Sequence, residues 1–180
     1  MNTVSPEIDV TLRDGRAVHL RAALPADEAE LLQAFGRMSA DARYMRFMHS
    51  VSKPNLDRLR KVLASFPESG IGLVATVPAA DGIDIVGSAV LVLGSRAHSG
   101  EFALNVAAEY AAVGLGGTLM NALIAAARGR GLEEMEGFVL AENAPMLRLA
   151  ERLGFSVAPD PEDRAVRICR LPLGDPQAKT

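Results

Sequence analysis

The sequence predicts an α/β (α+β) fold in which flanking helices cover a mixed central sheet of about six to seven strands. Apolar runs of strand length recur along the chain. Asp14-Gly15 separates two alternating runs, as in a β-hairpin. After residue 101 the pattern reads strand, helix, strand, helix, which favours a parallel crossover at the end of an otherwise antiparallel sheet.

The elements of the first half follow from apolar periodicities of about two or 3.6 residues and from turn and cap residues between them. They are strands at 10–13 and 16–21, helices that begin at Pro25 and Ser39, a helix at 52–63 that ends before Pro67, and strands at 71–77 and 83–93. Asp81-Gly82 favours a reversal between the last two strands, which should form the antiparallel middle of the sheet.

The second half is built around a loop rich in glycine. A strand at 101–106 leads into it and a helix at 118–128 follows, then a strand at 134–140, a helix that begins near Asn143, and closing strands at 156–158 and 165–171. On the first strand, period two places Phe102 and Leu104 on one face and Glu101 on the other.

Length and composition support one globular domain, which we place at residues 8–172, with tails at 1–7 and 173–180. Hydrophobic residues make up 49% and charged residues 23% of the chain. The net charge of −3 argues against a general nucleic-acid binder, which needs a basic face. Cys169 is the only cysteine, so no internal disulfide forms, and we expect it to be inert packing in a strand. With no signal-like or membrane-length apolar segment, the expected location is cytoplasmic, away from membranes.

The loop at 112–117 carries three glycines, Gly114, Gly116 and Gly117, directly before a helix. Such a loop lets the backbone approach a ligand, and the free N–H groups of the helix start favour a phosphate or diphosphate. The alternative is a helix start softened by glycine that binds nothing. A P-loop is excluded because no Gly-Lys-Ser/Thr follows. A dinucleotide site is disfavoured, although the acidic residues at 133–136 fall near the required spacing.

The pattern Gly114-Leu115-Gly116, an alanine-rich helix, and Asn143 followed by Leu153-Gly154-Phe155 resembles the acetyl-CoA core of the GNAT acyltransferase superfamily. Two positions depart from that pattern. Ala111 stands where the superfamily usually has Gln or Arg, and Ala150 stands where many members have a Tyr general acid. The loss of the side chain at Ala111 predicts weaker acetyl-CoA binding.

Within the superfamily, the stretches Leu12-Arg13-Asp14-Gly15, Arg43-Tyr44-Met45-Arg46-Phe47 and Glu101-Phe102-Ala103 are similar to the acyltransferase domain of bacterial Pat-type protein lysine acetyltransferases. That subgroup works without the Tyr and uses a glutamate as base. The resemblance covers most of the chain.

The resemblance implies a cofactor site and a base. The strand backbone around Leu104, Asn105 and Val106 would pair with the pantetheine arm of acetyl-CoA, and the amides of Ala112, Val113, Gly114, Leu115, Gly116 and Gly117 would hold its diphosphate. Thr118 would add a hydroxyl or cap the helix, and Asn143 would bond the pantetheine or serve as an N-cap. No metal is expected.

Glu101 is the candidate general base, since its position matches the Pat-type glutamate and its apolar surroundings would raise its pKa. The alternative is a solvated glutamate at a strand end. His98 has a suitable pKa but stands in a loop of small residues, and His19 is expected on a strand surface.

The sequence thus leads us to expect an N-acyltransferase that moves acetyl from acetyl-CoA to a primary amine, with a protein lysine preferred as the acceptor. Two alternatives are a small-molecule amine acetyltransferase and a non-catalytic acyl-CoA-binding regulatory module. Tyr44, Arg46 and His49 are candidates for acceptor contact, but for Tyr44 and Phe47 the preferred interpretation is a core role. The sequence leaves the oligomeric state open, a homodimer included.

Overall fold

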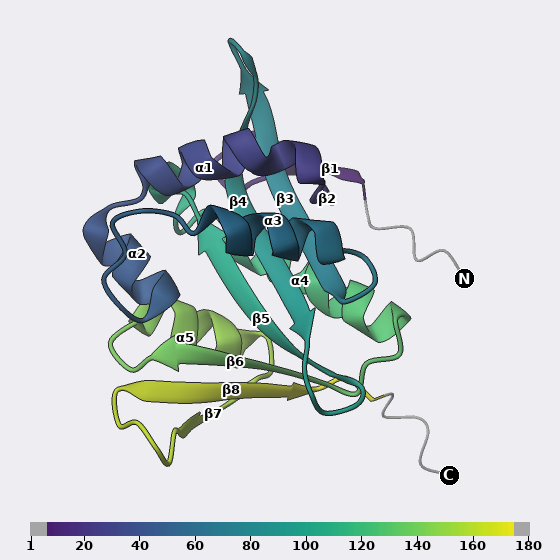
Figure 1. The fold of residues 1–180 in the computed structure, drawn as a ribbon, viewed down its shortest axis with the longest axis vertical. Coiled ribbons are helices and arrows are strands. Elements are labelled where there is room, and N and C mark those ends of the chain that lie inside the picture. Colours follow the sequence, from purple (N-terminus) through teal and green to yellow (C-terminus); the bar gives the residue numbers. More distant parts are fainter. Residues whose placement is uncertain (1–6, 175–180) are drawn as a thin grey trace.

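A single eight-stranded sheet runs through the molecule, in the order β1-β2-β3-β4-β5-β6-β8-β7 (Figure 1). The computed structural model describes residues 7–174. The strands are β1 (Ile8–Thr11), β2 (Ala17–Ala22), β3 (Gly70–Ala79), β4 (Gly82–Leu93), β5 (Ser99–Val106), β6 (Glu134–Leu140), β7 (Ser156–Pro159) and β8 (Val166–Pro172). The expected number of about six to seven strands was slightly low, because all eight segments predicted as strands join the sheet, the short edge strands β1 and β7 included.

Helices cover both faces of this sheet (Figure 1). They are α1 (Glu28–Arg37), α2 (Ala40–Phe47), α3 (Leu56–Ser65), α4 (Leu115–Gly129) and α5 (Ala144–Arg152), with single 3₁₀ turns η1 (Pro25–Asp27) and η2 (Ala108–Tyr110). The helices α1 and α3 lie over the face turned to the viewer, and α4 lies behind the sheet. No helix within residues 7–174 is long and apolar enough to cross a membrane.

The larger core lies between the sheet and α4. Leu119, Met120 and Leu123 of α4 are fully buried there. They recur at helical spacing on the inner face of a 15-residue helix, so burial of that face stabilises both the helix and its position behind β3, β4 and β5. A smaller cluster around Leu63 and Val74 anchors α3 on the opposite face.

The connection β5–α4–β6 gives the only parallel strand pair in the described sheet, which confirms the predicted crossover. Every other neighbouring pair is antiparallel. The crossover carries the glycine loop at its start, so the loop and the two central strands are positioned by the same unit.

Some predicted boundaries were displaced. The helix expected at 52–63 begins only at Leu56, because Pro54 precedes Asn55, whose side chain caps the helix by accepting from the Arg58 N–H. The helix expected from Thr118 begins three residues earlier, at Leu115. Leu173, assigned to the C-terminal tail, is buried and donates its N–H to the Glu133 carbonyl at 2.7 Å. The remaining tail residues 1–6 and 175–180 lie outside the described part of the chain.

A buried ion pair ties β2 to η1. The Asp27 carboxylate accepts two bonds from the Arg21 guanidinium, at 2.8 and 2.7 Å, and one from the Leu24 N–H at 2.8 Å. Burial by itself would raise the pKa of Asp27, but the bonds from Arg21 and Leu24 outweigh it and hold the pKa below 3.8. The carboxylate is therefore ionised in the folded protein at neutral pH.

We expect Asp27→Asn to lower the free energy of unfolding by about 2–3 kcal/mol, because it leaves the Arg21 charge without its partner. The loss is smaller than for a fully buried pair, since Arg21 keeps 22% of its side chain exposed. Because the folded pKa is lowered, the contribution is complete above the unfolded value near 3.8 and is lost as pH falls through the folded value. Urea unfolding of both proteins at pH 7 and pH 3 should show a difference that shrinks in acid. An equal difference at both pH values would contradict this account.

Candidate functional site

The glycine loop presents a row of unpaired backbone donors. In the described part of the chain, none of the N–H groups of residues 112–117 has a protein acceptor. Ala112 and Gly114 both have left-handed backbone, with φ of 60° and 96°, and Gly114 is the N-cap of α4 without a side-chain cap bond. The first turn of α4 contains no acidic residue. The loop therefore offers several donors, at the positive end of a helix dipole, to an external acceptor.

Two of the loop glycines serve packing between elements. A methyl group placed on Gly116 would lie 3.2 Å from Leu149 Cδ2 and 3.5 Å from Leu104 Cδ2, and one on Gly117 would lie 3.8 Å from Leu149 Cδ1. The glycines thus let the start of α4 approach β5 and α5 closely. The sequence pattern suggested only a role toward a ligand and gave no sign of these long-range contacts.

The polar side chains beside the loop are engaged in local structure. The Thr118 hydroxyl donates to the Gly114 carbonyl at 3.0 Å, and the Thr118 N–H donates to the same oxygen. Asn143 Oδ1 accepts from the Met146 N–H at 3.3 Å and so caps α5. Asn143 thus performs the N-cap function that the sequence left as one of two alternatives, whereas the Thr118 hydroxyl bonds back to the carbonyl of the N-cap residue Gly114 and caps no N–H group.

The strands β5 and β6 separate directly after Glu101. They pair only at Ser99–Glu101 with Glu134–Glu136, although β5 continues to Val106 and β6 to Leu140. On its other edge β5 remains paired with β4 along residues 100–106. The edge of β5 that faces β6 therefore lacks a strand partner from Phe102 onward, and we call this opening the fork.

Alternation along β5 decides which backbone groups face the fork. The Ala107 N–H donates to the Val86 carbonyl of β4 at 2.8 Å. In an antiparallel pair the hydrogen-bonded residues alternate, so Asn105 also points its backbone toward β4, while Leu104 and Val106 point theirs into the fork. Of the three strand residues assigned to the cofactor, two are oriented to offer backbone bonds there.

Glu101 stands at the vertex of the fork. Its neighbour Phe102 is buried against Gly137 and Phe155, so period two turns the Glu101 side chain to the opposite face, which carries α2 and α3. Glu101 is exposed, and Glu136 stands opposite it in the parallel register.

Although Glu101 is exposed overall, the surrounding protein removes part of the solvent from its carboxylate, and this desolvation raises its pKa; the charge of Glu136 raises the pKa further. The positive charges of Arg58 and Arg46 oppose this rise without cancelling it. Glu136 itself lies within 3.4 Å of Arg96 and of Arg170. Glu101 is thus a carboxylate with a raised pKa at an accessible position, which suits a general base.

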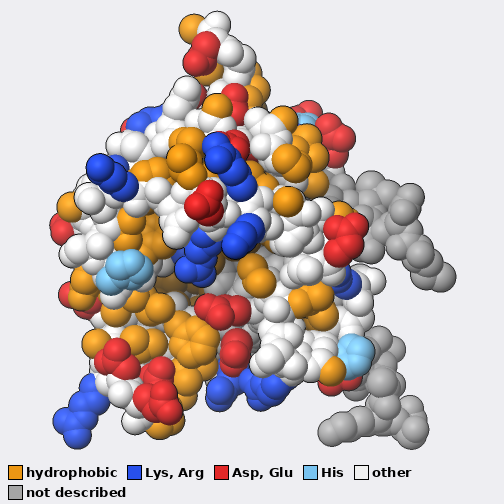
Figure 2. Space-filling view, in the orientation of Figure 1, with side chains coloured by type: hydrophobic (Ala, Val, Ile, Leu, Met, Phe, Trp, Pro, Cys, Tyr) orange, Lys and Arg blue, Asp and Glu red, His pale blue; other side chains and the backbone are white. Residues whose placement is uncertain are grey.

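The face around the fork combines both signs of charge. Figure 2 shows basic and acidic side chains around a hollow near the middle of this face. The charges of Arg46 on α2 and Arg58 on α3 both act on Glu101. Burial lowers the pKa of Arg46, and Arg58 lowers it further. Arg46 was among the predicted acceptor contacts, whereas Arg58 and Glu136 were not placed at the base, because only the packing of α3 and the strand register bring them there.

The helix α2, which borders this face, is held by Arg43. Its guanidinium donates to the Phe35 carbonyl at 3.0 Å and to the Ser52 carbonyl at 3.3 Å, and it lies 4.3 Å from the Phe35 ring centroid. Phe47 packs on Phe35 at 5.9 Å between centroids. Tyr44 is 38% exposed, so its interpretation as a core residue was wrong.

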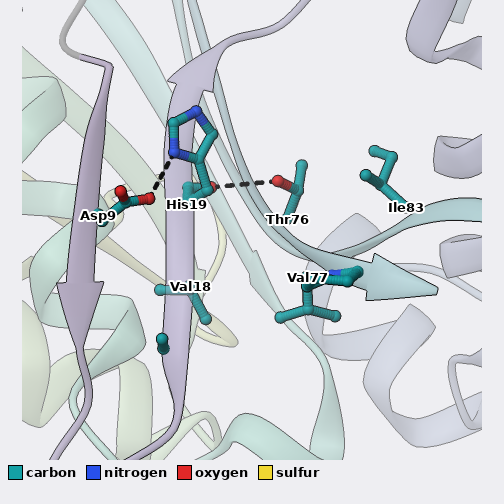
Figure 3. A pocket seen from close by; sticks show the side chains of 8 residues that line it. Asp9, Val18, His19, Thr76, Val77 and Ile83 are labelled. Atoms are coloured by element: carbon teal, nitrogen blue, oxygen red, sulfur yellow. Dashed lines mark hydrogen bonds and ion pairs between the residues drawn. The ribbon is translucent and has the colours of Figure 1, made fainter.

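Neither His98 nor His19 lies at the fork. His98 is exposed in the β4–β5 loop, where its carbonyl accepts from Glu133. His19 lies on β2 in a small pocket (Figure 3), and a hydrogen bond to Asp9 at 2.8 Å raises its pKa. This pocket is lined by Asp9, Ala17, Val18, His19, Thr76, Val77, Pro78 and Ile83, none of which is a predicted site residue.

Cys169 is fully buried on β8. Burial raises the pKa of its thiol to about 11. At neutral pH the thiol is therefore protonated and out of contact with solvent, as its assignment to packing requires.

Comparison with known proteins gives a consistent result. The model of the acetyltransferase (GNAT) family matches residues 41–155, which contain α2 except its first residue, the fork, the glycine loop and α5. An acetyltransferase of Pseudomonas aeruginosa is 29% identical over 163 residues, covering 91% of this chain and 88% of that protein.

Two further similarities concern Pat proteins. The acetyltransferase Pat of Mycolicibacterium smegmatis is 31% identical over 147 residues, which are 82% of this chain but only 44% of Pat. The chain therefore spans less than half of that relative. Among solved structures, the GNAT domain of S. lividans PAT superposes with a TM-score of 0.83 at 20% identity, covering 92% of this chain and 96% of that domain. At this identity the similarity shows the fold.

Proposed function

The chain belongs to the GNAT acetyltransferase family and is therefore an acetyltransferase. From this premise we propose its acetyl donor, its acceptor and its general base. It transfers acetyl from acetyl-CoA to a primary amine, with the ε-amine of a protein lysine as the preferred acceptor and Glu101 as the general base. The observation that carries this proposal is the fork, which joins an unpaired strand edge to a carboxylate with a raised pKa.

The diphosphate of acetyl-CoA binds the N–H groups of residues 112–117. Six consecutive donors without a protein acceptor fit the oxygens of a diphosphate, and the dipole of α4 favours its negative charge. The exposed side chain of Ala111 offers no donor, so the backbone has to supply this contact. We therefore expect Ala111→Arg to raise the affinity for acetyl-CoA, although the backbone contact does not depend on a side chain at this position.

The pantetheine arm lies in the fork as an extended segment. Its amides bond the backbone of Leu104 and Val106, which face the opening, in the way that a strand would. Asn105 contributes through its side chain, since its backbone is directed to β4. Asn143 can still offer its Nδ2, because only its Oδ1 is used for capping. This orientation brings the thioester to the vertex of the fork, beside Glu101.

The reaction begins with removal of a proton from the acceptor. A lysine ammonium of pKa ~10.4 is neutral for only about one part in 10³–10⁴ at pH 7. The Glu101 carboxylate takes this proton directly or through one water. The neutral amine then attacks the thioester carbonyl, the new C–N bond forms and the C–S bond breaks. The nitrogen loses its second proton as it becomes an amide, and this proton passes to the departing CoA thiolate directly or through water. Glu101 returns the proton of the ammonium group to solvent before the next turnover. Ala150 carries only a methyl group, which is fully buried, so no general acid acts from that position.

A protein lysine suits the open site. Glu101 is exposed on a face that is hollowed near its middle (Figure 2), and a long lysine side chain reaches such a carboxylate from the surface of a folded partner. The stretches at 12–15 and 43–47, which resemble Pat-type enzymes, lie in the β1–β2 turn and in α2. A small amine remains the second candidate because the hollow is also open to it.

Release of the CoA thiol tests the function. Wild-type protein is mixed with acetyl-CoA and with lysine-containing peptides, a folded protein, free lysine and small amines in parallel, and acetylated products are identified by mass spectrometry. We expect the largest kcat/KM with a lysine in a peptide or protein. Saturable acetyl-CoA binding without turnover on any amine would overturn the proposed transfer and favour a binding module.

The charges around Glu101 predict opposite pH shifts in two variants. The base must be ionised, so kcat/KM falls on the acid side through the pKa of Glu101. Glu136→Gln removes a repelling charge, so we expect this acid limb to move to lower pH. Arg58→Gln removes an attracting charge and should move it to higher pH. The measurement is kcat/KM at fixed ionic strength across pH 4–9. Limbs that coincide in all three proteins would exclude Glu101 as the titrating group.

A further inference from the structure

The turn between β1 and β2 is docked on the glycine loop. The Arg13 N–H donates to the Val113 carbonyl at 3.1 Å, and Arg16 Nη2 donates to the Glu109 carbonyl. The Arg16 guanidinium also lies 3.9 Å from the Tyr110 ring centroid and is paired with Asp14 at 2.6 Å. Two anchors therefore fix this turn against the segment that leads into α4.

Docking places the Arg13 guanidinium on Gly114. A methyl group built on Gly114 would lie 3.2 Å from Arg13 Nε and 3.7 Å from Nη2, so the charged end of Arg13 covers the residue that caps α4. Arg16 is neutralised by Asp14, but within residues 7–174 the Arg13 guanidinium has no hydrogen bond or ion pair with a protein group.

Without a ligand, this arrangement is electrostatically unfavourable. A cation stands at the positive end of the α4 dipole, beside six N–H groups that point to no acceptor. The first turn of α4 has no acidic side chain that would compensate. An anion of more than one charge would reverse the balance, since a guanidinium donates two parallel bonds to phosphate oxygens.

We propose that Arg13 binds the diphosphate of the acyl-coenzyme and thereby makes the enzyme select phosphorylated coenzyme over acyl-pantetheine. The inference rests on the proposed function, which puts the diphosphate at residues 112–117. It assigns to a distant turn the cationic side chain that the loop itself lacks, because Ala111 carries none.

The test compares two acetyl donors, acetyl-CoA and S-acetylpantetheine, which lacks the diphosphate. For Arg13→Gln we expect the Kd of acetyl-CoA, measured by calorimetry, to rise about 10- to 100-fold, as for loss of a charge-assisted bond. The value of kcat/KM with S-acetylpantetheine should stay within twofold of wild type. Arg13→Lys keeps the charge but loses the paired donors of the guanidinium, so its Kd for acetyl-CoA should lie between those of wild type and Arg13→Gln. Arg164→Gln, the same charge change on an exposed turn residue, serves as the control.

Salt adds a second readout. The Kd of acetyl-CoA should rise more steeply with ionic strength in wild type than in Arg13→Gln, because one charge contact is absent from the variant. If Arg13→Gln bound acetyl-CoA as wild type does, or lost both donors equally, Arg13 would be excluded as a diphosphate ligand while the proposed function stood. If wild-type protein bound no acetyl-CoA, both proposals would fall.

Discussion

Glu101→Gln is expected to lower kcat for acetyl transfer by about 10²- to 10⁴-fold at pH 7, the usual contribution of a positioned base. Glutamine keeps the size and shape of the side chain and one acceptor oxygen, but it cannot take the proton of the ammonium group. The Kd of acetyl-CoA should change little, because in the proposed binding mode the diphosphate contacts the loop at 112–117 and the pantetheine contacts the β5 backbone, not the Glu101 side chain. Release of the CoA thiol under saturating acetyl-CoA gives kcat, and calorimetry gives Kd.

The dependence on pH makes this prediction specific. As pH approaches the amine pKa of ~10.4, the acceptor loses its proton without help, so the deficit of the variant should shrink. Glu133→Gln, the same change at an exposed residue outside the fork, is the control and should keep wild-type rates. Equal rates for Glu101→Gln and wild type at pH 7 would remove Glu101 from the mechanism.

Phe102→Ala should lower the free energy of unfolding by about 3–5 kcal/mol, the range for a buried Phe. Phe102 is 5% exposed, and its ring stands 5.1 Å from the Phe155 centroid in an edge arrangement. The ring also lies against Gly137 of β6, so it fills the space on the α4 side of the fork. Urea unfolding of wild type and variant measures the difference. A loss below about 1 kcal/mol would contradict this packing.

The contact with Gly137 provides a companion test. A methyl group on Gly137 would lie 2.4 Å from Phe102 Cε1 and Cζ, so Gly137→Ala should destabilise by about 1–3 kcal/mol through overpacking. In the double variant with Phe102→Ala the clash partner is gone, so the second change should cost much less than it does alone. Additive losses would show that the two residues are not in contact.

Local patterns were sufficient for much of the fold. The hairpin around Asp14-Gly15, the strand at 134–140 and the cap at Ser39 all follow from signals within a few residues, and each is found where it was expected. The parallel crossover followed from the order of elements. Boundaries failed where a cap competed with periodicity, as at Asn55.

The residues of the candidate site likewise fall into those that the sequence could name and those that only the three-dimensional structure brings together. The loop at 112–117 and Glu101 could be named from the sequence, through local glycine spacing and a family resemblance. Glu136, Arg58 and Arg13 could not, because each is distant in sequence from the residue it acts on. Strand register, the packing of α3 and the docking of the first hairpin bring them together. Glu136 did have one usable signal, since a parallel pairing of 101–106 with 134–140 sets two glutamates opposite each other.

The sheet is joined at its centre by only three residue pairs, Ser99–Glu101 with Glu134–Glu136. It therefore consists of a five-stranded and a three-stranded ladder that share a short seam. In the proposed binding mode, an extended ligand bonded along β5 would lengthen that seam, so the coenzyme would complete the protein's own architecture while it reacts. Binding of the ligand and the stability of the contact between the two ladders would then be thermodynamically linked. Slower amide hydrogen exchange along β5 in the presence of ligand would show this link.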